Sequence, residues 1–384
     1  MSFNTDKTEK KINASRESLE SPLVSVVIPC LNRADFLIPT LESVLQQDYP
    51  NIECIVMDGG STDGTTDILC RYDGRIEWKS QPDRGPSDAI NKGWWLLGGE
   101  ILAWLNADDV WAPAAVSKAV AYFQEHPDVD VVYGDCGIID EHGKRTITMN
   151  VRDWNLRHAV EHCDHIIFQA ASFMRRSILE RVGWLWPKLC HDHELWLRIS
   201  RAGGRLQRIP TLLAYARNHA GNLGYCSDLV IPLKLEITKK FFSDPGVPQE
   251  VRGLRHRSIS NAYLRGMEYV IWRDLRWSHD VPNSLGLLAK ALNADPSNIL
   301  AAMEHLCRLA DRMAAIFARR YLPHSVYQKL KAAKRRLLEK VSFGSTGGRS
   351  GHPLTEGPRM LNHAFSYSKI IVLVRVATED FIRK

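Results

Sequence analysis

Apolar runs that alternate with helical patterns constrain the fold of this 384-residue chain most. Residues 23–29 form a β-branched run that ends in proline, and residues 34–45 follow with leucines and a valine at helical spacing. The pattern returns as a predicted strand over 51–57, and again as a strand near 76–79 that leads into a helix from Pro86. This alternation predicts an α/β fold with a doubly wound sheet and right-handed crossovers.

Two adjacent carboxylates end the next apolar run. Residues 101–105 predict a buried strand, so Asp108 and Asp109 are expected at its carboxyl end. In an open α/β sheet the ligand crevice lies beyond those strand ends, where carboxylates suit Mg2+ or Mn2+ that carries a phosphate-containing substrate. The residues predict a nucleotide site, and the alternative is a turn followed by a helix N-cap.

Asp58 ends the strand predicted over 51–57 in the same way, and the glycine-rich turn from Asp58 to Gly64 follows it. A carboxylate in this place either binds a ribose or a base N–H, or closes a local Asx-turn. The turn does not match Gly-x-Gly-x-x-Gly, which argues against a dinucleotide-binding fold.

The helix predicted from Pro86 has one face that can line a cleft. Asp88 and Lys92 lie four residues apart on that face, opposite the buried stripe of the helix. Lys92 is placed either to bind a phosphate or to pair with Asp88, and the sequence leaves both open.

A further acidic position begins a helix that is predicted to end at Gly203 and Gly204. Asp192 lies in its first turn, where a carboxylate either acts chemically or only caps the helix. His191 and His193 flank it, but no second group of ligands at metal spacing accompanies them, so a zinc site is not predicted.

Composition excludes several classes of protein. The eight cysteines contain no Cys-x-x-Cys pair, which argues against a secreted disulfide framework and favours the cytoplasm. The first 20 residues lack an apolar segment, and no later apolar run is long enough to span a bilayer. Residues 311–349 hold ten Lys and Arg against two Asp and Glu. This local basicity predicts a solvated helical face or peripheral contact with an anionic membrane, and we expect no nucleic acid partner.

The motifs in their order resemble family 2 glycosyltransferases of the GT-A fold, over roughly residues 22–225. The resemblance rests on six segments, namely Ser25–Pro29 with Asn32, Ser43–Pro50, Asp58–Thr65, Asp88–Gly93, Asn106–Asp109 and His191–Arg198. It implies transfer of a sugar, with inversion, from a nucleotide-diphosphate sugar to a hydroxyl of a surface polysaccharide or lipid-linked glycan. It also implies a divalent cation, Mn2+ or Mg2+.

The resemblance assigns roles residue by residue. Donor-binding positions are Pro29 and Asn32 beside the base, Asp58 at the base or ribose, Asp88 and Lys92 on the helical face, and Asp108 at the ribose or sugar. The remaining positions are Asp109 for the cation, His219 for the cation or diphosphate, Asp192 as catalytic base and Glu194 as the alternative base. Leu31 and His191 depart from the family pattern, in which many members carry an aromatic residue and Glu.

The chain is predicted to have four parts. These are a disordered tail over 1–21, the GT-A domain over 22–225, a helical region over 226–343, and a flexible linker with a C-terminal segment over 344–384. Two other functions compete with glycosyl transfer: a metal-dependent nucleotidyltransferase and a non-catalytic nucleotide-sugar binding module. A glycine-rich phosphate loop after the first strand favours the nucleotidyltransferase, and residues 29–33 contain none.

Overall fold

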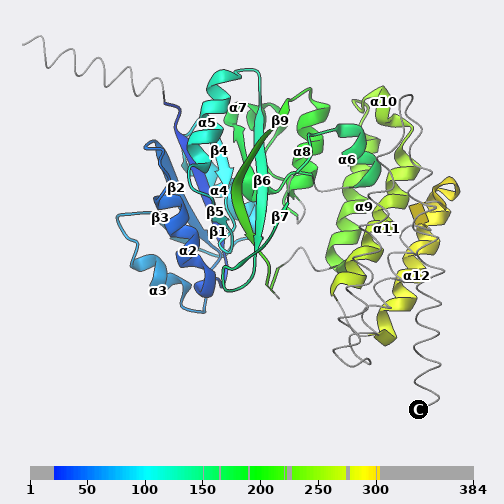
Figure 1. Cartoon of the computed structure of the whole chain (residues 1–384), viewed down its shortest axis with the longest axis horizontal. Helices are drawn as coiled ribbons and strands as arrows, with labels where there is room; N and C mark the ends of the chain where they lie inside the picture. Colours follow the sequence, from blue (N-terminus) through cyan, green and yellow to red (C-terminus); the bar gives the residue numbers. More distant parts are fainter. Residues whose placement is uncertain are drawn as a thin grey trace, which may run out of the picture. The chain divides into compact units, whose positions relative to one another are not determined.

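A computed structural model describes most of the first 302 residues, namely 21–149, 151–163, 166–188, 191–219, 221–222, 227–273, 277–299 and 301–302. The chain divides into two compact units at Gly266 (Figure 1). The tail predicted over 1–21, apart from its last residue, and the segments predicted over 311–349 and 344–384 lie outside the described residues.

The first unit is built on a mixed sheet in the order β3-β2-β1-β4-β8-β6-β9-β5, with β7 paired to β6. The pairs β1 with β2, β1 with β4, β2 with β3, and β6 with β9 are parallel, and the other pairs are antiparallel. The strands are β1 Val24–Cys30, β2 Ile52–Asp58, β3 Glu77–Ser80, β4 Ile101–Trp104, β5 Val110–Trp111, β6 Val131–Ile139, β7 Arg145–Met149, β8 Ser172–Arg175 and β9 Leu206–Arg217. This sheet confirms the predicted α/β class.

Helices cover both faces of the sheet, and alternate residues of each strand point to different cores. In β1, Val26 and Ile28 pack in one core with Leu37, whereas Val27 packs in the other core with Trp94. The helices are α2 Ala34–Leu45, α3 Thr65–Cys70, α4 Pro86–Leu96, α5 Ala115–Glu125, α6 Leu156–His162, α7 Arg176–Val182, α8 His191–Arg201, α9 Ser227–Ser243, α10 Gln249–Arg252 and α11 Arg255–Arg273. Burial on both faces explains the nearly continuous apolar sequence of β1.

The first unit extends past residue 225, where the sequence predicts a boundary. Ile237 and Phe241 of α9 are buried in the same core as Trp196 of α8. These apolar side chains complete the sheet's second core, so the first unit continues through Gly266. The second unit contains α12 Trp277–Ala294 and η3 Pro296–Asn298.

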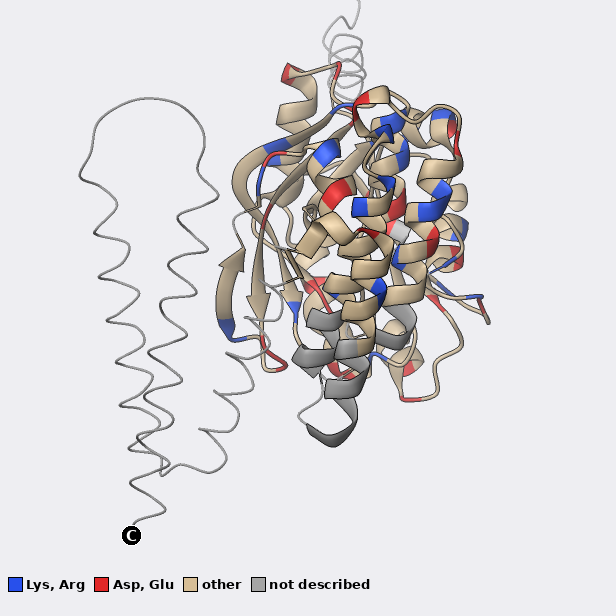
Figure 2. Ribbon diagram, turned by 90° about the vertical axis from the view of Figure 1, so that its right-hand side faces the viewer, with Lys and Arg blue, Asp and Glu red and all other residues tan. Residues whose placement is uncertain are grey.

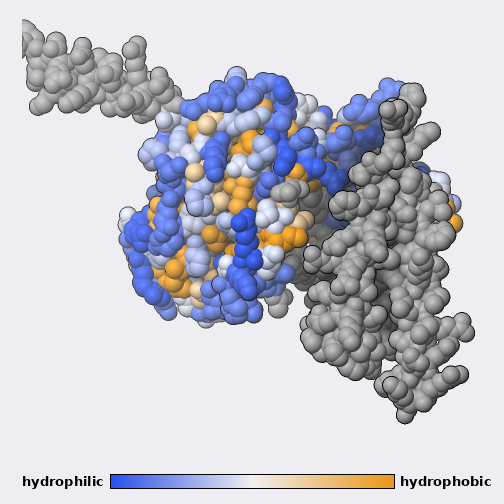
Figure 3. All heavy atoms as spheres, in the orientation of Figure 1, coloured by the Kyte–Doolittle hydropathy of each residue, from blue (hydrophilic) through white to orange (hydrophobic). Residues whose placement is uncertain are grey.

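The described surface is mixed in charge and largely hydrophilic. Lys and Arg as well as Asp and Glu are scattered over the helices that face the viewer in Figure 2. Figure 3 shows small apolar areas between hydrophilic ones, and the exposed apolar side chains include Leu31, Trp95 and Ile147. None of the helices in the described part of the chain is both long enough and apolar enough to cross a membrane.

The parallel strands β1, β2 and β3 end at the same level, and β4 points in the same direction but ends opposite Val27 of β1. Cys30, the last residue of β1, pairs with Asp58 of β2, which in turn pairs with Ser80 of β3. On the other side, Val27 of β1 pairs with Trp104, the last residue of β4. The residues that follow β1, β2 and β4 therefore gather at one edge of the sheet.

Candidate functional site

The loops that follow β1 and β2 are joined by hydrogen bonds through Asn32. Its backbone N–H donates to Ser61 Oγ at 2.7 Å, and its Oδ1 accepts from the backbone N–H of Thr62 at 2.8 Å. Asn32 has a φ of 52°, a left-handed conformation that asparagine adopts more readily than most residues. Pro29 is buried in β1 beside Met57. The two loops thus form one rim at the strand ends.

Asp58 is the anchor of this rim. Its carboxylate is 1% exposed and accepts hydrogen bonds from the backbone N–H groups of Gly60 and Ser61, at 3.2 and 3.1 Å. It also accepts from the hydroxyls of Ser61 and Ser80. Both carboxylate oxygens therefore contact protein donors, as in the Asx-turn that the sequence offers as the alternative.

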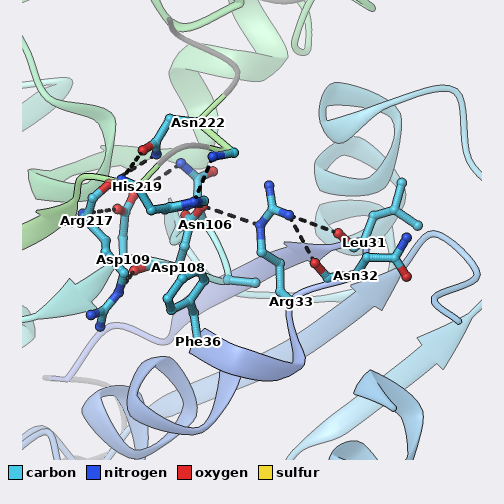
Figure 4. Close-up of polar contacts among 12 residues, drawn as sticks. Leu31, Asn32, Arg33, Phe36, Asn106, Asp108, Asp109, Arg217, His219 and Asn222 are labelled. Carbon is cyan, nitrogen blue, oxygen red and sulfur yellow. Dashed lines mark hydrogen bonds and ion pairs between the residues drawn. The ribbon is translucent and has the colours of Figure 1, made fainter. Parts of the chain in front are cut away.

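Asp108 lies beyond β4, where chain segments from both ends of the domain meet (Figure 4). One of its oxygens, Oδ2, lies 3.0 Å from His219 Nε2 and 3.4 Å from Arg33 Nε. The backbone N–H of Gly221 donates to Nδ1 of His219 at 3.1 Å, so Nε2 carries the proton that His219 donates to Asp108. The Asp108 carboxylate is thus buried between an arginine and a histidine.

Asp109 points to a different set of partners. Its Oδ1 accepts from the backbone N–H of Arg217 at 3.0 Å. Its Oδ2 accepts from Asn106 Nδ2 at 3.1 Å and from Gln169 Nε2 at 3.2 Å. Burial and, next, the neighbouring Asp108 charge raise the pKa of Asp109 to about 8. Through these three hydrogen bonds, Asp109 connects the turn after β4 to the end of β9.

The ring of His219 is held by its surroundings. Phe36 of α2 lies against it with ring centroids 4.6 Å apart, and Arg217 Cζ lies 5.1 Å from the centroid of Phe36. The backbone N–H of His219 donates to Asn222 Oδ1 at 2.6 Å. These contacts fix the imidazole beside Asp108, as Figure 4 shows.

Asp88 and Lys92 pair with each other on α4. Lys92 Nζ lies 2.8 Å from Asp88 Oδ2, and Arg84 donates to the same carboxylate through its backbone N–H and Nη2, at 3.1 and 3.2 Å. The hydrogen bond from Lys92 is the main reason that the pKa of Asp88 falls to about 2. Of the two contacts open to Lys92, the structure contains the ion pair with Asp88.

On α8, Asp192 and Glu194 differ in their environment. Glu194 is 5% exposed, with Arg198 Nη2 at 2.8 Å and Lys240 Nζ at 3.2 Å from its oxygens. Arg198 also donates to the backbone oxygens of residues 182–184, which fixes the loop before α8. Asp192 is half-buried in the first turn of the same helix.

Among the described residues, no three His, Cys, Asp or Glu side chains gather closely enough to bind an ion by themselves. Asp108 and His219 form a pair of oxygen and nitrogen donors 3.0 Å apart. The carboxylate of this pair suits Mg2+ or Mn2+, which one or two carboxylates commonly hold together with substrate phosphates and water, and the imidazole nitrogen favours Mn2+ of the two. His219 can bind a cation through Nε2 only in the tautomer that carries its proton on Nδ1.

Several residues of the site are not among those predicted from the sequence. Arg33, Gln169 and Arg217 contact the two acids from segments as far as 75 and 109 residues away. Asn91 of α4 exchanges two hydrogen bonds with the backbone of Leu185, at 2.9 and 3.0 Å. Asn91 and Asn106 carry a local signal, because they belong to the segments Asp88–Gly93 and Asn106–Asp109.

Comparison with known proteins identifies relatives of the domain. Residues 25–183 match the family model described as glycosyl transferase family 2. An uncharacterized glycosyltransferase of Rickettsia prowazekii (strain Madrid E) is 28% identical over 197 residues, which are 48% of this chain and 61% of the relative. The Escherichia coli UDP-Glc:alpha-D-GlcNAc-diphosphoundecaprenol beta-1,3-glucosyltransferase WfaP is 28% identical over 203 residues, 52% of this chain and 79% of the relative.

Among solved structures, S. aureus TarS 1-349 in complex with UDP-GlcNAc superposes with a TM-score of 0.54 at 15% sequence identity. The match covers 77% of this chain and 90% of TarS 1-349. This similarity confirms the predicted GT-A type of fold. The alignment with the Rickettsia protein spans 61% of that relative's length.

Proposed function

We propose that this chain, whose residues 25–183 match the model of glycosyl transferase family 2, transfers a sugar from a nucleotide-diphosphate sugar to a hydroxyl of an acceptor glycan. The observation that carries this proposal is the buried Asp108 carboxylate, held between His219 and Arg33 at the ends of parallel strands. Ligands of open α/β sheets bind at such strand ends.

The donor occupies the rim formed by the loops after β1 and β2 in this proposal. Pro29 and Asn32 line the base, and Leu31 is half exposed beside them. Asp58 acts by holding the rim in shape, since both its oxygens accept hydrogen bonds from the protein. UDP is the first nucleotide to test, because WfaP is named for UDP-Glc and TarS was solved with UDP-GlcNAc.

We place the divalent cation, Mn2+ or Mg2+, on Asp108 and on His219 in its Nδ1-protonated tautomer. The sequence suggested Asp109 for this role, but three protein donors already contact the oxygens of Asp109. Asp109 instead orients Arg217, whose Nε donates to the backbone oxygen of Asp108 at 2.9 Å. When bound, the cation supplies positive charge that stabilises the departing diphosphate.

On the acceptor side, Asp192 takes the proton of the attacking hydroxyl. Direct displacement by that hydroxyl inverts the anomeric carbon, and a positioned base contributes about 10²- to 10⁴-fold to the rate. Glu194 is unsuited to the role because its carboxylate is held by Arg198 and Lys240. Asp88 and Lys92 support the donor side as an ion pair on α4.

The acceptor class in this proposal is a lipid-linked glycan or a growing polysaccharide. It is supported by the name of WfaP, which describes a diphosphoundecaprenol-linked substrate. Peripheral contact with an anionic membrane stays a prediction from residues 311–349, which lie outside the described residues. A cytoplasmic location likewise stays a prediction.

The test is turnover by the full chain with UDP-glucose, UDP-GlcNAc and GDP-mannose, each with Mn2+ and a GlcNAc-diphosphate-lipid acceptor. We expect release of a nucleoside diphosphate that depends on the acceptor, and NMR of the product should show the inverted anomeric configuration. Release of pyrophosphate from a nucleoside triphosphate and a sugar phosphate would identify a nucleotidyltransferase instead. Tight nucleotide-sugar binding without turnover on any acceptor would identify a binding module.

A further inference from the structure

Arg33 links the nucleotide rim to the acidic turn. Its Nη1 donates to the backbone oxygens of Asn32 and Leu31, at 3.0 and 3.4 Å, and its Nε lies 3.4 Å from Asp108 Oδ2 (Figure 4). The side chain is 25% exposed, whereas that of Asp108 is 9% exposed. The guanidinium therefore lies at the surface of the site and covers a buried carboxylate.

The buried charge of Asp108 requires a partner in the chain without ligands. A carboxylate removed from water is costly unless positive charge or hydrogen-bond donors surround it, and Arg33 and His219 supply them on the same oxygen. A divalent cation that binds Asp108 takes over this compensation. It also repels the guanidinium, because two positive charges then lie within a few ångströms of each other.

A diphosphate that arrives with the cation offers Arg33 a new partner. The planar guanidinium is suited to phosphate oxygens, to which it donates two parallel hydrogen bonds. The hydrogen bonds from Nη1 to the backbone oxygens of Leu31 and Asn32 keep the guanidinium on the nucleotide side of the site. A small rotation of the side chain therefore moves the guanidinium from the Asp108 carboxylate to the diphosphate.

We propose that Arg33 is a positioning residue that changes partner. It pairs with Asp108 in the free chain and with the diphosphate of a nucleoside diphosphate in the complex. This inference rests on the proposed function, since it takes the nucleotide and the cation at Asp108 from it. As a consequence, Arg33 opposes binding of the cation alone and favours binding of the cation with the nucleotide.

The proposal is tested by measuring the affinities for Mn2+ and for UDP, which should change in opposite directions when Arg33 is replaced. Arg33→Gln keeps hydrogen-bonding groups but removes the charge. Without nucleotide, Mn2+ followed by electron paramagnetic resonance should bind this variant about threefold more tightly, the scale of one partly exposed ion pair. With Mn2+ at saturation, UDP followed by calorimetry should bind about tenfold more weakly, which corresponds to about 1.4 kcal/mol.

Two further variants act as comparisons. Arg33→Lys keeps the charge without the planar fork, so its UDP affinity should lie between those of the wild type and Arg33→Gln. Arg75→Gln removes an exposed arginine whose partner is Glu42, and it should leave both affinities unchanged. GDP is measured in parallel with UDP on every variant.

A structural role for Arg33 predicts a different pattern. If the arginine only clamps the loop, Arg33→Gln should lower the melting temperature and weaken Mn2+ and UDP together, and this result overturns the proposal. Unchanged affinities in both titrations overturn it as well. If the wild type binds neither UDP nor GDP in the presence of Mn2+, the proposed function itself fails.

Discussion

The ends of β2 and β4 carry the same sequence signal but different structures. Asp58 is the last residue of β2 and finds its partners nearby in the sequence, in its own turn and in β3. Asp108 follows β4 and contacts Arg33 and His219, which are 75 residues before it and 111 residues after it. A carboxylate at a strand end is therefore a structural anchor when its own turn satisfies it, and a candidate ligand when charged groups from distant segments do.

The same contrast separates two neighbours in the chain. Asp109 accepts three hydrogen bonds from amide donors, whereas Asp108 faces an arginine and a histidine. The donors to Asp109 are uncharged amides, whereas the guanidinium beside Asp108 is 25% exposed and is the group that we propose to change partner. This contrast predicts that a substitution at Asp108 mainly lowers activity, whereas a substitution at Asp109 mainly lowers stability.

The largest effect is expected for Asp108→Asn. It removes the charge that we propose to bind the cation, so turnover should fall by about 10³-fold, the upper range for losing one electrostatic contact to a developing anion. The melting temperature should change little, because Asn still accepts from His219. Steady-state kinetics and a thermal melt of Asp108→Asn and Asp109→Asn measure the contrast. If the two variants are equally stable and Asp108→Asn is more active than Asp109→Asn, then Asp109 and not Asp108 binds the cation.

Asp192→Asn should give the next largest effect and extends the comparison to α8. Asn keeps the size and capping ability of Asp but cannot take a proton, so turnover should fall by about 10²-fold at unchanged donor affinity. The matched variant is Glu194→Gln, which leaves Arg198 and Lys240 without a charged partner and should mainly lower stability. A fully active Asp192→Asn together with an inactive, stable Glu194→Gln would make Glu194 the base.

Asp58→Ala tests the anchor at the end of β2. It leaves the buried donors of Gly60, Ser61 and Ser80 without their acceptor, so the free energy of unfolding should fall by about 2 kcal/mol. Urea denaturation measures this loss, and calorimetry at low temperature measures UDP affinity on the folded variant. A loss of UDP affinity at wild-type stability would show that Asp58 reads the nucleotide directly and that the contrast with Asp108 is false.

The smallest effect is expected at Asp88, and it depends on pH. The pKa of Asp88 is lowered from 3.8 to about 2 in the folded chain. Its charged form therefore stabilises the fold above pH 3.8, and this contribution disappears as the pH falls through about 2. Asp88→Asn should lower the melting temperature by about 2 °C at pH 7. The gap between wild type and variant should narrow only as the pH falls from 3.8 to about 2, and a constant gap over that range contradicts this explanation.

The strand and helix pattern was largely predictable because it depends on local periodicity. The runs over 23–29, 51–57 and 101–105 became β1, β2 and β4, and the helices expected at 34–45 and from Pro86 begin where the sequence places them. The end of the first unit was not predictable. Ile237 and Phe241 of α9 belong to the core of the sheet because of a contact that no local pattern records.

The sequence alone indicated Asp58, Asp108 and Asp109 as candidates for a site, because each comes at the end of an apolar run that becomes a strand, and the carboxyl ends of parallel strands meet at one edge of the mixed sheet. Only the tertiary structure decided which groups each acid contacts. His219 reaches Asp108 across 111 residues, and Lys240 reaches Glu194 across 46. A carboxylate's charge state and availability depend on the groups packed within a few ångströms of it, and in a folded chain these groups come from segments that are distant in sequence.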